Sequence, residues 1–423
     1  MNIRELLDLE DVQFLQEIVK RYPEAKMLAG PAEASPEGNQ KLQDTAIAYD
    51  VFNEDTPVHE TAIEADRTFL GILLFKAAYN EDRSKFPNLS DDNWQGLVSL
   101  TKNNVITDED LELILYALTA QDLGKTQVLV DAYQSEFGSP AADHDKLIYE
   151  ITAECPDMFE GFKNLSAPNQ EAYLNGLAAD LNLGQFVQGE NLPCNLQQIL
   201  KIDDRSRRVR LLTELFDFAG ATGHVDRHKS ILMTNDNYTA FSRALFSLSG
   251  HDSATAAYTQ YIKSRGQRVG LVAEQDDLAS DSEKFALSRI AALSRAFTPE
   301  QGQEILDVWS GLPDEDRQTL ITEMSITGLN ASDFKGILLY YSPAVIANAI
   351  KAKGNFSAGL SVGLKALAKT YRYVRSEVQE TGLGQVTVNV NALARLAASN
   401  PDEIESQVSA TSLGDGSFYT LEI

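Results

Sequence analysis

The chain is poor in cysteine, because only Cys155 and Cys194 occur among its 423 residues. They lack the close spacing of a metal site and are too few for a disulfide framework, so a reducing compartment is the simple interpretation. Positive charge is also scarce, with 36 Lys and Arg against 62 Asp and Glu and a formal net charge of −26. A chain this acidic repels nucleic acid and anionic lipid, and we expect neither as a partner.

Long apolar runs are absent as well, because the apolar stretch Phe69–Ala78 is interrupted by Lys76. This pattern excludes a membrane-spanning helix of ordinary length. The first residues, MNIRELLDLEDVQ, are acidic and amphipathic, which is not the pattern of a secretory signal. We therefore expect a cytoplasmic protein; a bacterial effector exported without a cleavable signal would have the same features.

What is present is the composition of an ordinary globular protein, 43% hydrophobic and 23% charged. Apolar residues recur mainly at helical spacing, so we predict a mostly α-helical fold. The predicted parts are N-terminal helices with a long loop (1–54), a helical domain (55–250) and a C-terminal helical region packed on it (251–423). Helices are expected over Pro299–Leu312 and Ser332–Tyr341, and the alternating segments 385–390 and 417–421 predict a minor β-hairpin near the C-terminus.

The most informative segment is Leu111–Asp145. Its first apolar residues, at helical spacing, lead directly into Asp122-Leu123-Gly124-Lys125, so Asp122 emerges where a buried face ends. An unpaired buried carboxylate is strongly destabilising, and we therefore predict that Asp122 has a partner. Lys125 supplies a cation beside it, and Gly124 permits a tight change of direction.

The string Ala117–Lys125, ALTAQDLGK, resembles the signature helix of HD-domain phosphohydrolases, in which an apolar helix ends in His-Asp, an aliphatic residue, Gly and Lys. The resemblance implies an HD-like helical bundle in which Asp122 binds a metal ion and Lys125 lies near the phosphate. Gln121 stands where the family has its histidine, and an amide is a poorer transition-metal ligand than imidazole. With Gln121 in this position, the site would hold one metal ion instead of two, favour a harder ion, or be inactive. The chain also resembles an uncharacterised group of bacterial and fungal proteins in the motif series DLGK, DHD, LNLGQ, GEN and AGATGH. This second resemblance implies no activity.

Histidine is scarce too, and four of the five histidines lie between His59 and His228. This clustering beside acids and glycines predicts a site in the first half of the chain. The resemblance implies a histidine on an earlier helix, and His59, at the expected start of such a helix, is the candidate; a surface position in the first turn is the alternative. His224 follows small residues that allow close backbone approach, and we expect it to line the same pocket.

A second group of acids and imidazole follows at Asp143-His144-Asp145. Asp143 is a good N-cap for the next helix. The resemblance implies a further imidazole after the signature helix, so His144 is a predicted metal ligand, with Asp145 either a ligand or the group that orients it. The predicted metal site thus comprises His59, Asp122, His144, Asp145 and His224, and its ion is divalent: Mn, Fe, Mg or Zn.

Two further segments are unusual. The first, 178–193, is dense in amides and glycine, which predicts either binding of a polar substrate or a buried network joining helices. Its candidate substrate-binding residues are Asn182, Gln185, Gln188 and Asn191, and Glu190 is a candidate late ligand or general base. The second is a basic cluster of Arg205, Arg207, Arg208 and Arg210, for which pairing with Asp203, Asp204 and Glu214 is expected and a phosphate anchor is the alternative.

These residues and the resemblance predict a divalent-metal-dependent phosphohydrolase or phosphodiesterase that acts on a nucleotide or another small phosphoester. Asp122, Lys125 and Glu190 are the predicted catalytic residues. The metal would activate water, and Lys125 would offset developing negative charge. The alternative is a non-catalytic helical interaction protein, either a scaffold or an exported effector, with a degenerate HD core. A third interpretation is a metal-free binder of a polar small molecule, built on the amide-rich segment.

Overall fold

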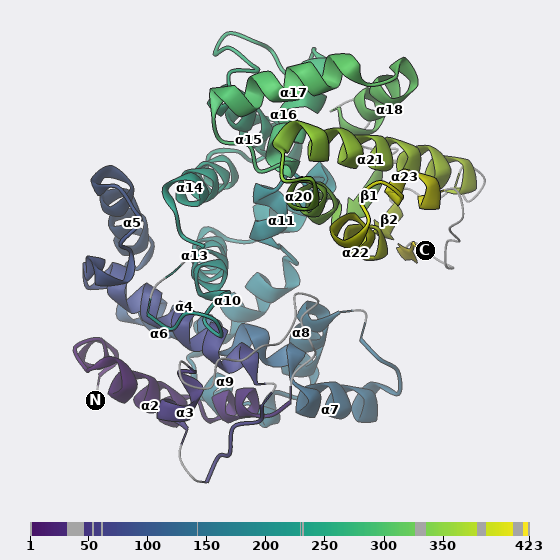
Figure 1. Cartoon of the computed structure of the whole chain (residues 1–423). Helices are drawn as coiled ribbons and strands as arrows, with labels where there is room; N and C mark the ends of the chain where they lie inside the picture. The colour runs from purple at the N-terminus through teal and green to yellow at the C-terminus, as the bar shows by residue number, and fades with distance from the viewer. Residues whose placement is uncertain are drawn as a thin grey trace. The chain divides into compact units, whose positions relative to one another are not determined.

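The computed structural model describes residues 2–31, 46–52, 55–60, 62–141, 143–228, 230, 232–325, 336–378, 386–408 and 418–421 (Figure 1). The chain divides into two compact units: unit 1 is Met1–Leu183 with Lys201–Phe241, and unit 2 is Gly184–Leu200 with Ser242–Ile423. The prediction of a mostly α-helical fold is confirmed in both units. Among the helices described, none combines the length and apolar character needed to cross a membrane.

Unit 1 is built around three helices that pack on one another, α4 (Ile63–Tyr79), α6 (Asp108–Ala120) and α13 (Asp204–Gly220) (Figure 1). The sequence of α4 is largely apolar apart from the charged residues of its first two turns and Lys76, and nearly all of its side chains are buried. The remaining helices of unit 1 are α1 (Ile3–Leu6), α2 (Asp11–Arg21), η1 (Pro23–Ala29), α3 (Ala48–Val51), η3 (Arg83–Lys85), α5 (Asp91–Asn104), η4 (Gln121–Lys125), α7 (Gln127–Phe137), α8 (His144–Glu154), η5 (Pro156–Met158), α9 (Glu160–Asn164) and α10 (Ala167–Ala178).

The C-terminal end of α13 lies unusually close to α4. A Cβ atom at Gly220 would lie 2.5 Å from the carbonyl oxygen of Arg67 and from the backbone nitrogen of Gly71. Arg67 also donates a hydrogen bond from Nε to the carbonyl of Ala221 at 2.6 Å. The close backbone approach expected at these small residues is therefore confirmed, and it fixes where the turn that follows α13 begins.

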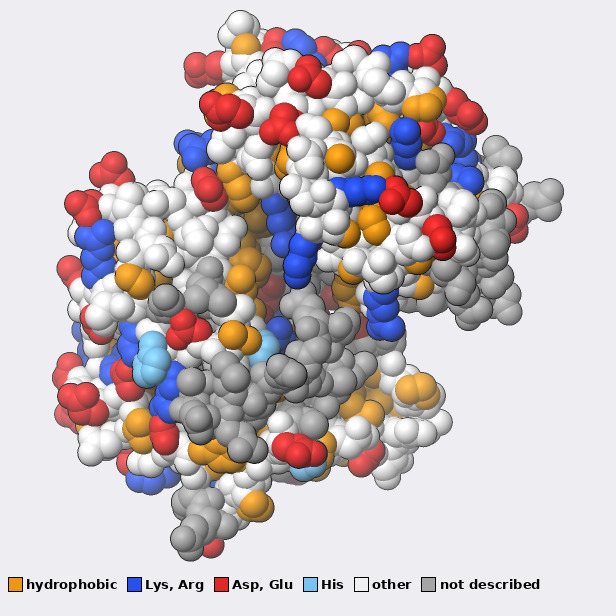
Figure 2. Space-filling view, in the orientation of Figure 1, with side chains coloured by type: hydrophobic (Ala, Val, Ile, Leu, Met, Phe, Trp, Pro, Cys, Tyr) orange, Lys and Arg blue, Asp and Glu red, His pale blue; other side chains and the backbone are white. Residues whose placement is uncertain are grey.

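Unit 2 has its own apolar core, formed by side chains such as Ile290, Leu364 and Leu393. Its elements are η6 (Pro193–Leu196), α15 (Ala254–Arg268), α16 (Ser282–Leu293), α17 (Pro299–Gly311), α18 (Asp314–Met324), α20 (Ser342–Lys353), α21 (Phe356–Val378), α22 (Asn391–Ser399) and α23 (Ile404–Gln407), with three strands. Three helices begin in one unit and end in the other: α11 (Leu183–Val187), α12 (Gln197–Lys201) and α14 (Asn235–Gly250). Figure 2 shows acidic and basic side chains interspersed over the face in view.

The strands β1 (Ile337–Tyr340), β2 (Val386–Asn389) and β3 (Phe418–Thr420) form a parallel sheet in the order β1-β2-β3. The two predicted segments do pair, but a hairpin is wrong because it requires antiparallel strands. Parallel strands need a crossover connection, and α22 with α23 lies between β2 and β3 in the chain. The helix predicted over Ser332–Tyr341 is also wrong over 337–340, which form β1; residues 332–335 lie outside the described residues.

Candidate functional site

The signature segment, Ala117–Lys125, is the segment that resembles the HD-domain signature helix. It forms the end of α6 and the short helix η4. Thr107 caps α6, because its side chain accepts a hydrogen bond from the backbone N–H of Asp110 at 3.1 Å. The apolar helix is buried as far as its last residue, so Asp122, the second residue of η4, lies deep in unit 1. As predicted, Asp122 has a partner: the Nζ atom of Lys125 lies 2.6 Å from its Oδ1 atom.

The same ammonium group contacts a second carboxylate, on α4. The distance from Lys125 Nζ to Glu64 Oε2 is 3.2 Å, and Arg67 Nη1 lies 2.8 Å from Glu64 Oε1. Asp122, Lys125, Glu64 and Arg67 thus form a chain of alternating charges, and the carboxylates of Glu64 and Asp122 are both buried. Two cations compensate two carboxylates, which is the condition for holding charges away from water.

Asp217 on α13 adds a third carboxyl group to this centre. Burial and the negative charge of Asp122 raise the pKa of Asp217 well above its ordinary value, which favours the neutral acid. Burial acts on Asp122 in the same direction, but Lys125, His144 and Arg67 outweigh it and hold the pKa of Asp122 below its ordinary value. When Asp217 is neutral, the two remaining carboxylates balance the two cations.

His144 is brought to the centre by a contact at Gly124. A Cβ atom at Gly124 would overlap the carbonyl oxygen of His144, so α8 begins directly against η4. Gly124 is therefore needed for close approach, and its backbone has no positive φ. Asp143 caps α8 as predicted, with Oδ1 accepting from the backbone N–H of Lys146 at 2.7 Å. The Nε2 atom of His144 lies 3.7 Å from Oδ2 of Asp145, and both side chains are partly exposed.

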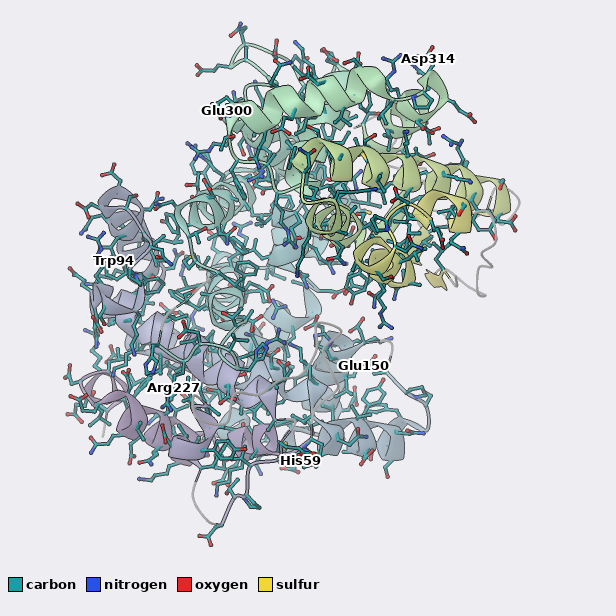
Figure 3. All side chains as sticks on the ribbon, viewed as in Figure 1. His59, Trp94, Glu150, Arg227, Glu300 and Asp314 are labelled. Carbon is teal, nitrogen blue, oxygen red and sulfur yellow. The ribbon has the colours of Figure 1, made fainter. Side chains whose placement is uncertain are left out.

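The other two predicted histidine ligands lie outside helices. His59 is exposed in the connection before α4 (Figure 3), and its backbone N–H donates to the carbonyl of Ala29 at 2.7 Å. The helix predicted after His59 is found as α4, but it begins at Ile63, so the predicted start at His59 is wrong. His224 is half-buried in a turn after α13, which ends at Gly220, so His224 and His228 do not share a helix. The roles of His59 and His224 as ligands stay predictions.

The residues near Asp122 do not fit a metal ion as they lie. Over the described part of the chain, no three His, Cys, Asp or Glu side chains are placed to hold one together. The ammonium group of Lys125 already contacts Asp122 and Glu64, where a metal ion would have to bind. A set of carboxylate oxygens would in any case suit Mg or Mn better than Zn. The chemistry that this arrangement supports is that of its own carboxyl groups and cations.

Glu190 lies in unit 2, whereas Asp122 and Lys125 lie in unit 1. The buried carboxylate of Glu190 accepts a hydrogen bond from the backbone N–H of Tyr341, which precedes α20. Burial raises the pKa of Glu190 to about 7, although two nearby arginines act in the opposite direction. Its predicted role as a general base stays a prediction, and its visible contact joins two parts of unit 2.

The amide-rich segment is divided between the two units. Asn182 is exposed and belongs to unit 1, and Gln185, Gln188 and Asn191 belong to unit 2. Gln188 Oε1 accepts hydrogen bonds from Nε and Nη2 of Arg295 at 3.1 and 2.7 Å. These bonds are of the kind expected in a polar network that joins helices. Substrate binding by the four amides stays a prediction.

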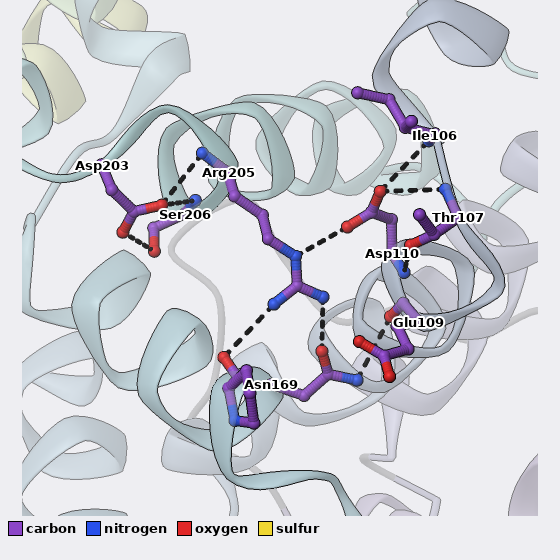
Figure 4. A network of polar contacts seen from close by, with 9 residues as sticks. Ile106, Thr107, Glu109, Asp110, Asn169, Asp203, Arg205 and Ser206 are labelled. Atoms are coloured by element: carbon purple, nitrogen blue, oxygen red, sulfur yellow. Dashed lines mark hydrogen bonds and ion pairs between the residues drawn. The ribbon is translucent and has the colours of Figure 1, made fainter.

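In the basic cluster at the start of α13, Arg207 and Arg210 form ion pairs with expected acids, whereas Arg205 pairs with Asp110. Arg205 donates from Nε to Asp110 Oδ1 at 2.7 Å and from Nη2 to Asn169 Oδ1 at 2.5 Å (Figure 4). Arg207 pairs with Asp204, and Arg210 pairs with Glu214. Arg205 thereby ties the first turn of α13 to the first turns of α6 and α10.

The residues Glu64 and Asp217 are not evident from the signature segment. A pattern that finds Asp217 is nevertheless present, because Arg210, Glu214 and Asp217 recur at helical spacing within an otherwise apolar stretch. Such spacing places charged side chains on one face of a helix. No sequence pattern of this kind identifies Glu64. It belongs to the centre because its carboxylate contacts the ammonium group of Lys125.

The fold and the site define a mostly α-helical protein whose unit 1 holds a buried, charge-balanced centre of carboxyl groups and cations. The family model described as Family of unknown function (DUF6829) matches residues 11–397, so the chain belongs to this family. No match was found among curated proteins or among solved structures. The matched range contains Asp122, Lys125 and Asp217.

Proposed function

We propose that unit 1 is a hydrolase of small phosphoesters whose centre is Asp122, Asp217 and Lys125. One observation carries the proposal: Lys125 Nζ lies 2.6 Å from Asp122 and favours its ionised form, whereas Asp217, beside that charge, has its pKa raised by burial and by Asp122. The lowered pKa of Asp122 makes it an ionised base, and the raised pKa of Asp217 makes it a neutral acid. Acid–base hydrolysis needs this division of roles.

In the proposed reaction, Asp122 takes a proton from a water molecule while the water oxygen bonds to phosphorus. The ester P–O bond breaks, and Asp217 gives its proton to the leaving oxygen, which becomes a hydroxyl group. Lys125 and Arg67 offset the negative charge that develops on the phosphoryl oxygens. Transfer of a proton from Asp122 to Asp217 then restores the centre.

A phosphoester is favoured over other esters by the resemblance of the signature segment and by the cations around the acid pair. Lys125 and Arg67 belong to the centre, where they contact the carboxylates of Asp122 and Glu64. Cations of this kind stabilise phosphoryl groups. With Asp217 neutral, the centre has no excess negative charge to repel such a substrate.

The test is hydrolysis of nucleotides, p-nitrophenyl phosphate and bis-p-nitrophenyl phosphate by the full chain, with and without EDTA. Asp217→Asn keeps the shape of the neutral acid but has no proton to give, so we expect retained folding and a kcat lower by about 10²–10⁴. Asp122→Asn should lower kcat over the same range. Asp204→Asn, at an exposed acid of the same helix, is the control and should leave kcat unchanged.

Two results would contradict the proposal: no turnover of any compound in the panel, or full activity in both Asp122→Asn and Asp217→Asn. Assays with added Mn²⁺ or Mg²⁺ belong to the same experiment. Turnover that requires an added metal and stops with EDTA would show instead that the carboxylates rearrange around an ion, as the family resemblance implies.

A second candidate is the non-catalytic helical interaction protein. It is favoured by the ion pairs themselves, because Lys125 contacts both Asp122 and Glu64, and Arg67 contacts Glu64. A centre in which each carboxylate already has its cation stabilises the fold without any substrate. Absence of turnover together with strong destabilisation on loss of Lys125 would support this candidate.

A further inference from the structure

A small pocket lies inside unit 1 beside Gln121. It lies between α6, η4, α10 and α13 and is partly open, and its space, counted with the solvent at its opening, is about 250 Å³. Leu177 and Val209 contribute to its apolar lining. Its polar lining consists of Gln121, Tyr173, Arg210 and Thr213. The pocket thus joins the end of the signature segment to the charged face of α13.

All four polar side chains are more than nine-tenths buried, with exposed fractions of 6% for Gln121 and Arg210, 3% for Tyr173 and 1% for Thr213. Each also has a buried atom that finds no hydrogen-bond partner among the described residues: Gln121 Oε1, Tyr173 Oη, Arg210 Nε and Thr213 Oγ1. Folded proteins satisfy nearly all of their buried polar atoms. Four unsatisfied atoms around one space therefore indicate that something else bonds to them.

Arg210 is partly engaged. Its Nη2 atom lies 2.8 Å from Glu214 Oε1 and donates to the carbonyl of Leu181 at 3.1 Å. The positive charge of Arg210 is therefore already compensated, and its buried Nε–H has no partner among the described residues. A molecule in the pocket needs an acceptor for this N–H and does not need a negative charge.

We propose that the pocket binds a small neutral molecule that carries an amide or urea group. Arg210 Nε can only donate and Gln121 Oε1 can only accept, so the ligand must offer a carbonyl oxygen to the first and an N–H to the second. The hydroxyl groups of Tyr173 and Thr213 can do either. An amide combines one acceptor and one donor within the span of a few atoms.

The size of the pocket restricts the ligand to a few non-hydrogen atoms. Its volume lies below the roughly 300–1,000 Å³ of ordinary small-molecule sites, and with the side chains as they lie the free room is that of about one water molecule. Leu177 and Val209 must therefore shift slightly to admit an amide. A ligand this small binds at best with a Kd on the order of tens of micromolar. The proposal does not depend on hydrolysis at Asp122, because binding is measured without turnover.

The test uses acetamide and N-methylurea as probes of the full chain, observed by saturation-transfer NMR and by titration calorimetry. Acetone is the matched comparison, because it has the carbonyl of acetamide but no N–H for Gln121. We expect acetamide to bind at least about tenfold more tightly than acetone, since an acceptor left unpaired in a buried site strongly disfavours the analogue.

Three variants separate binding from folding. Thr213→Val and Tyr173→Phe each remove an unpaired hydroxyl group, so we expect about tenfold weaker binding and an unchanged or higher Tm. Gly176→Ala adds a methyl group to the pocket lining at an ordinary 3.5 Å from the Arg210 side chain, and should abolish binding without loss of stability. Thr119→Val is the control, because that buried hydroxyl already donates to Leu115 and does not line the pocket.

The proposal is overturned if neither amide binds the full chain, if acetone binds as tightly as acetamide, or if Gly176→Ala binds as the unaltered protein does. It is also overturned if a crystal structure grown with acetamide contains only an ordered water in the pocket. Loss of binding in Thr213→Val together with a lower Tm would assign the hydroxyl a structural role and overturn its assignment as a ligand contact.

Discussion

At the scale of single residues, the ammonium group of Lys125 contacts two buried carboxylates, Asp122 on η4 and Glu64 on α4. Burial by itself would lower the pKa of Lys125, but Asp122 and Glu64 raise it above its ordinary value. Lys125→Met removes this cation and leaves both carboxylates without compensation. We expect a loss of about 3 kcal/mol in the free energy of unfolding, measured by chemical denaturation. Lys146→Met, at an exposed lysine of α8, is the control and should change it by less than about 0.5 kcal/mol.

Gly124 is the residue on which the meeting of η4 and α8 depends. A methyl group there would overlap the carbonyl oxygen of His144, which is backbone and cannot swing away. We expect Gly124→Ala to lower the free energy of unfolding by about 2–3 kcal/mol. Gly250→Ala is the matched control, because no atom lies within 4 Å of the added methyl group at the end of α14. Equal stability of the two variants would contradict the close contact.

Glu190 makes the stability of the chain depend on pH. Burial raises its pKa from the ordinary 4.5 to about 7 in the folded state. Between these values the folded state holds a proton that the unfolded state has lost, so stability falls as pH rises, by about 3 kcal/mol in all. Glu190→Gln cannot ionise and can still accept the hydrogen bond from Tyr341. We therefore expect it to match the unaltered protein near pH 4 and to exceed its stability above pH 7.

Denaturation curves at several pH values check this expectation. Glu323→Gln is the control and should change stability in the opposite direction at neutral pH. Glu323 accepts two hydrogen bonds from Arg375 at 3.0 and 2.6 Å. Loss of that ion pair should destabilise the chain by about 1 kcal/mol or more at neutral pH. A Glu190→Gln variant that is less stable than the unaltered protein at pH 8 would contradict the buried, proton-holding carboxyl group.

At the scale of elements, the first turn of α13 is held by a side-chain network and not by apolar packing alone. Asp203 caps the helix, and Arg205 reaches Asp110 and Asn169 on two other helices (Figure 4). We expect Arg205→Ala to lower the free energy of unfolding by about 2 kcal/mol, because it leaves the buried carboxylate of Asp110 without its cation. Arg207→Ala removes a pair made with the exposed Asp204 and should have an effect below about 0.5 kcal/mol.

Helices with clear local patterns were predictable, and elements defined by pairing were not. The helix expected over Pro299–Leu312 is found as Pro299–Gly311, because a capping box of Thr298 and Gln301 marks its start in the sequence. By contrast, Ile-Leu-Leu-Tyr at 337–340 has no periodicity, and a short apolar run suits a buried helix or a strand equally well. Only its pairing with β2 identifies it as a strand.

At the scale of the whole molecule, a net charge of −26 acts on the folded state as self-repulsion. The Debye length falls from about 30 Å at 0.01 M salt to about 8 Å at 0.15 M, so salt should weaken this repulsion. Buried ion pairs such as Lys125 with Asp122 are screened much less. We therefore expect the Tm to rise when sodium chloride is increased over this range, measured by scanning calorimetry. A falling Tm would show that exposed ion pairs outweigh the repulsion.

The division of the chain into two units depends on packing. The predicted boundary at residues 250 and 251 stays a prediction, and the chain enters unit 2 for the second time after Phe241. The excursion of Gly184–Leu200 into unit 2 does not follow from its amide-rich composition, because it depends on where those residues pack. Contacts such as that of Glu190 with Tyr341 join residues far apart in the sequence.

Local sequence patterns were enough to predict the helical class, the cap of α8 at Asp143, and the burial of the segment that ends at Asp122. Each of these depends on residues within a few turns of one another, which spacing and cap chemistry describe. Only the tertiary structure decided which charged groups meet: Glu64 with Lys125, and Asp217 near Asp122. That outcome depends on how α4, α6 and α13 pack, because packing places side chains from distant segments within the few ångströms over which ion pairs form.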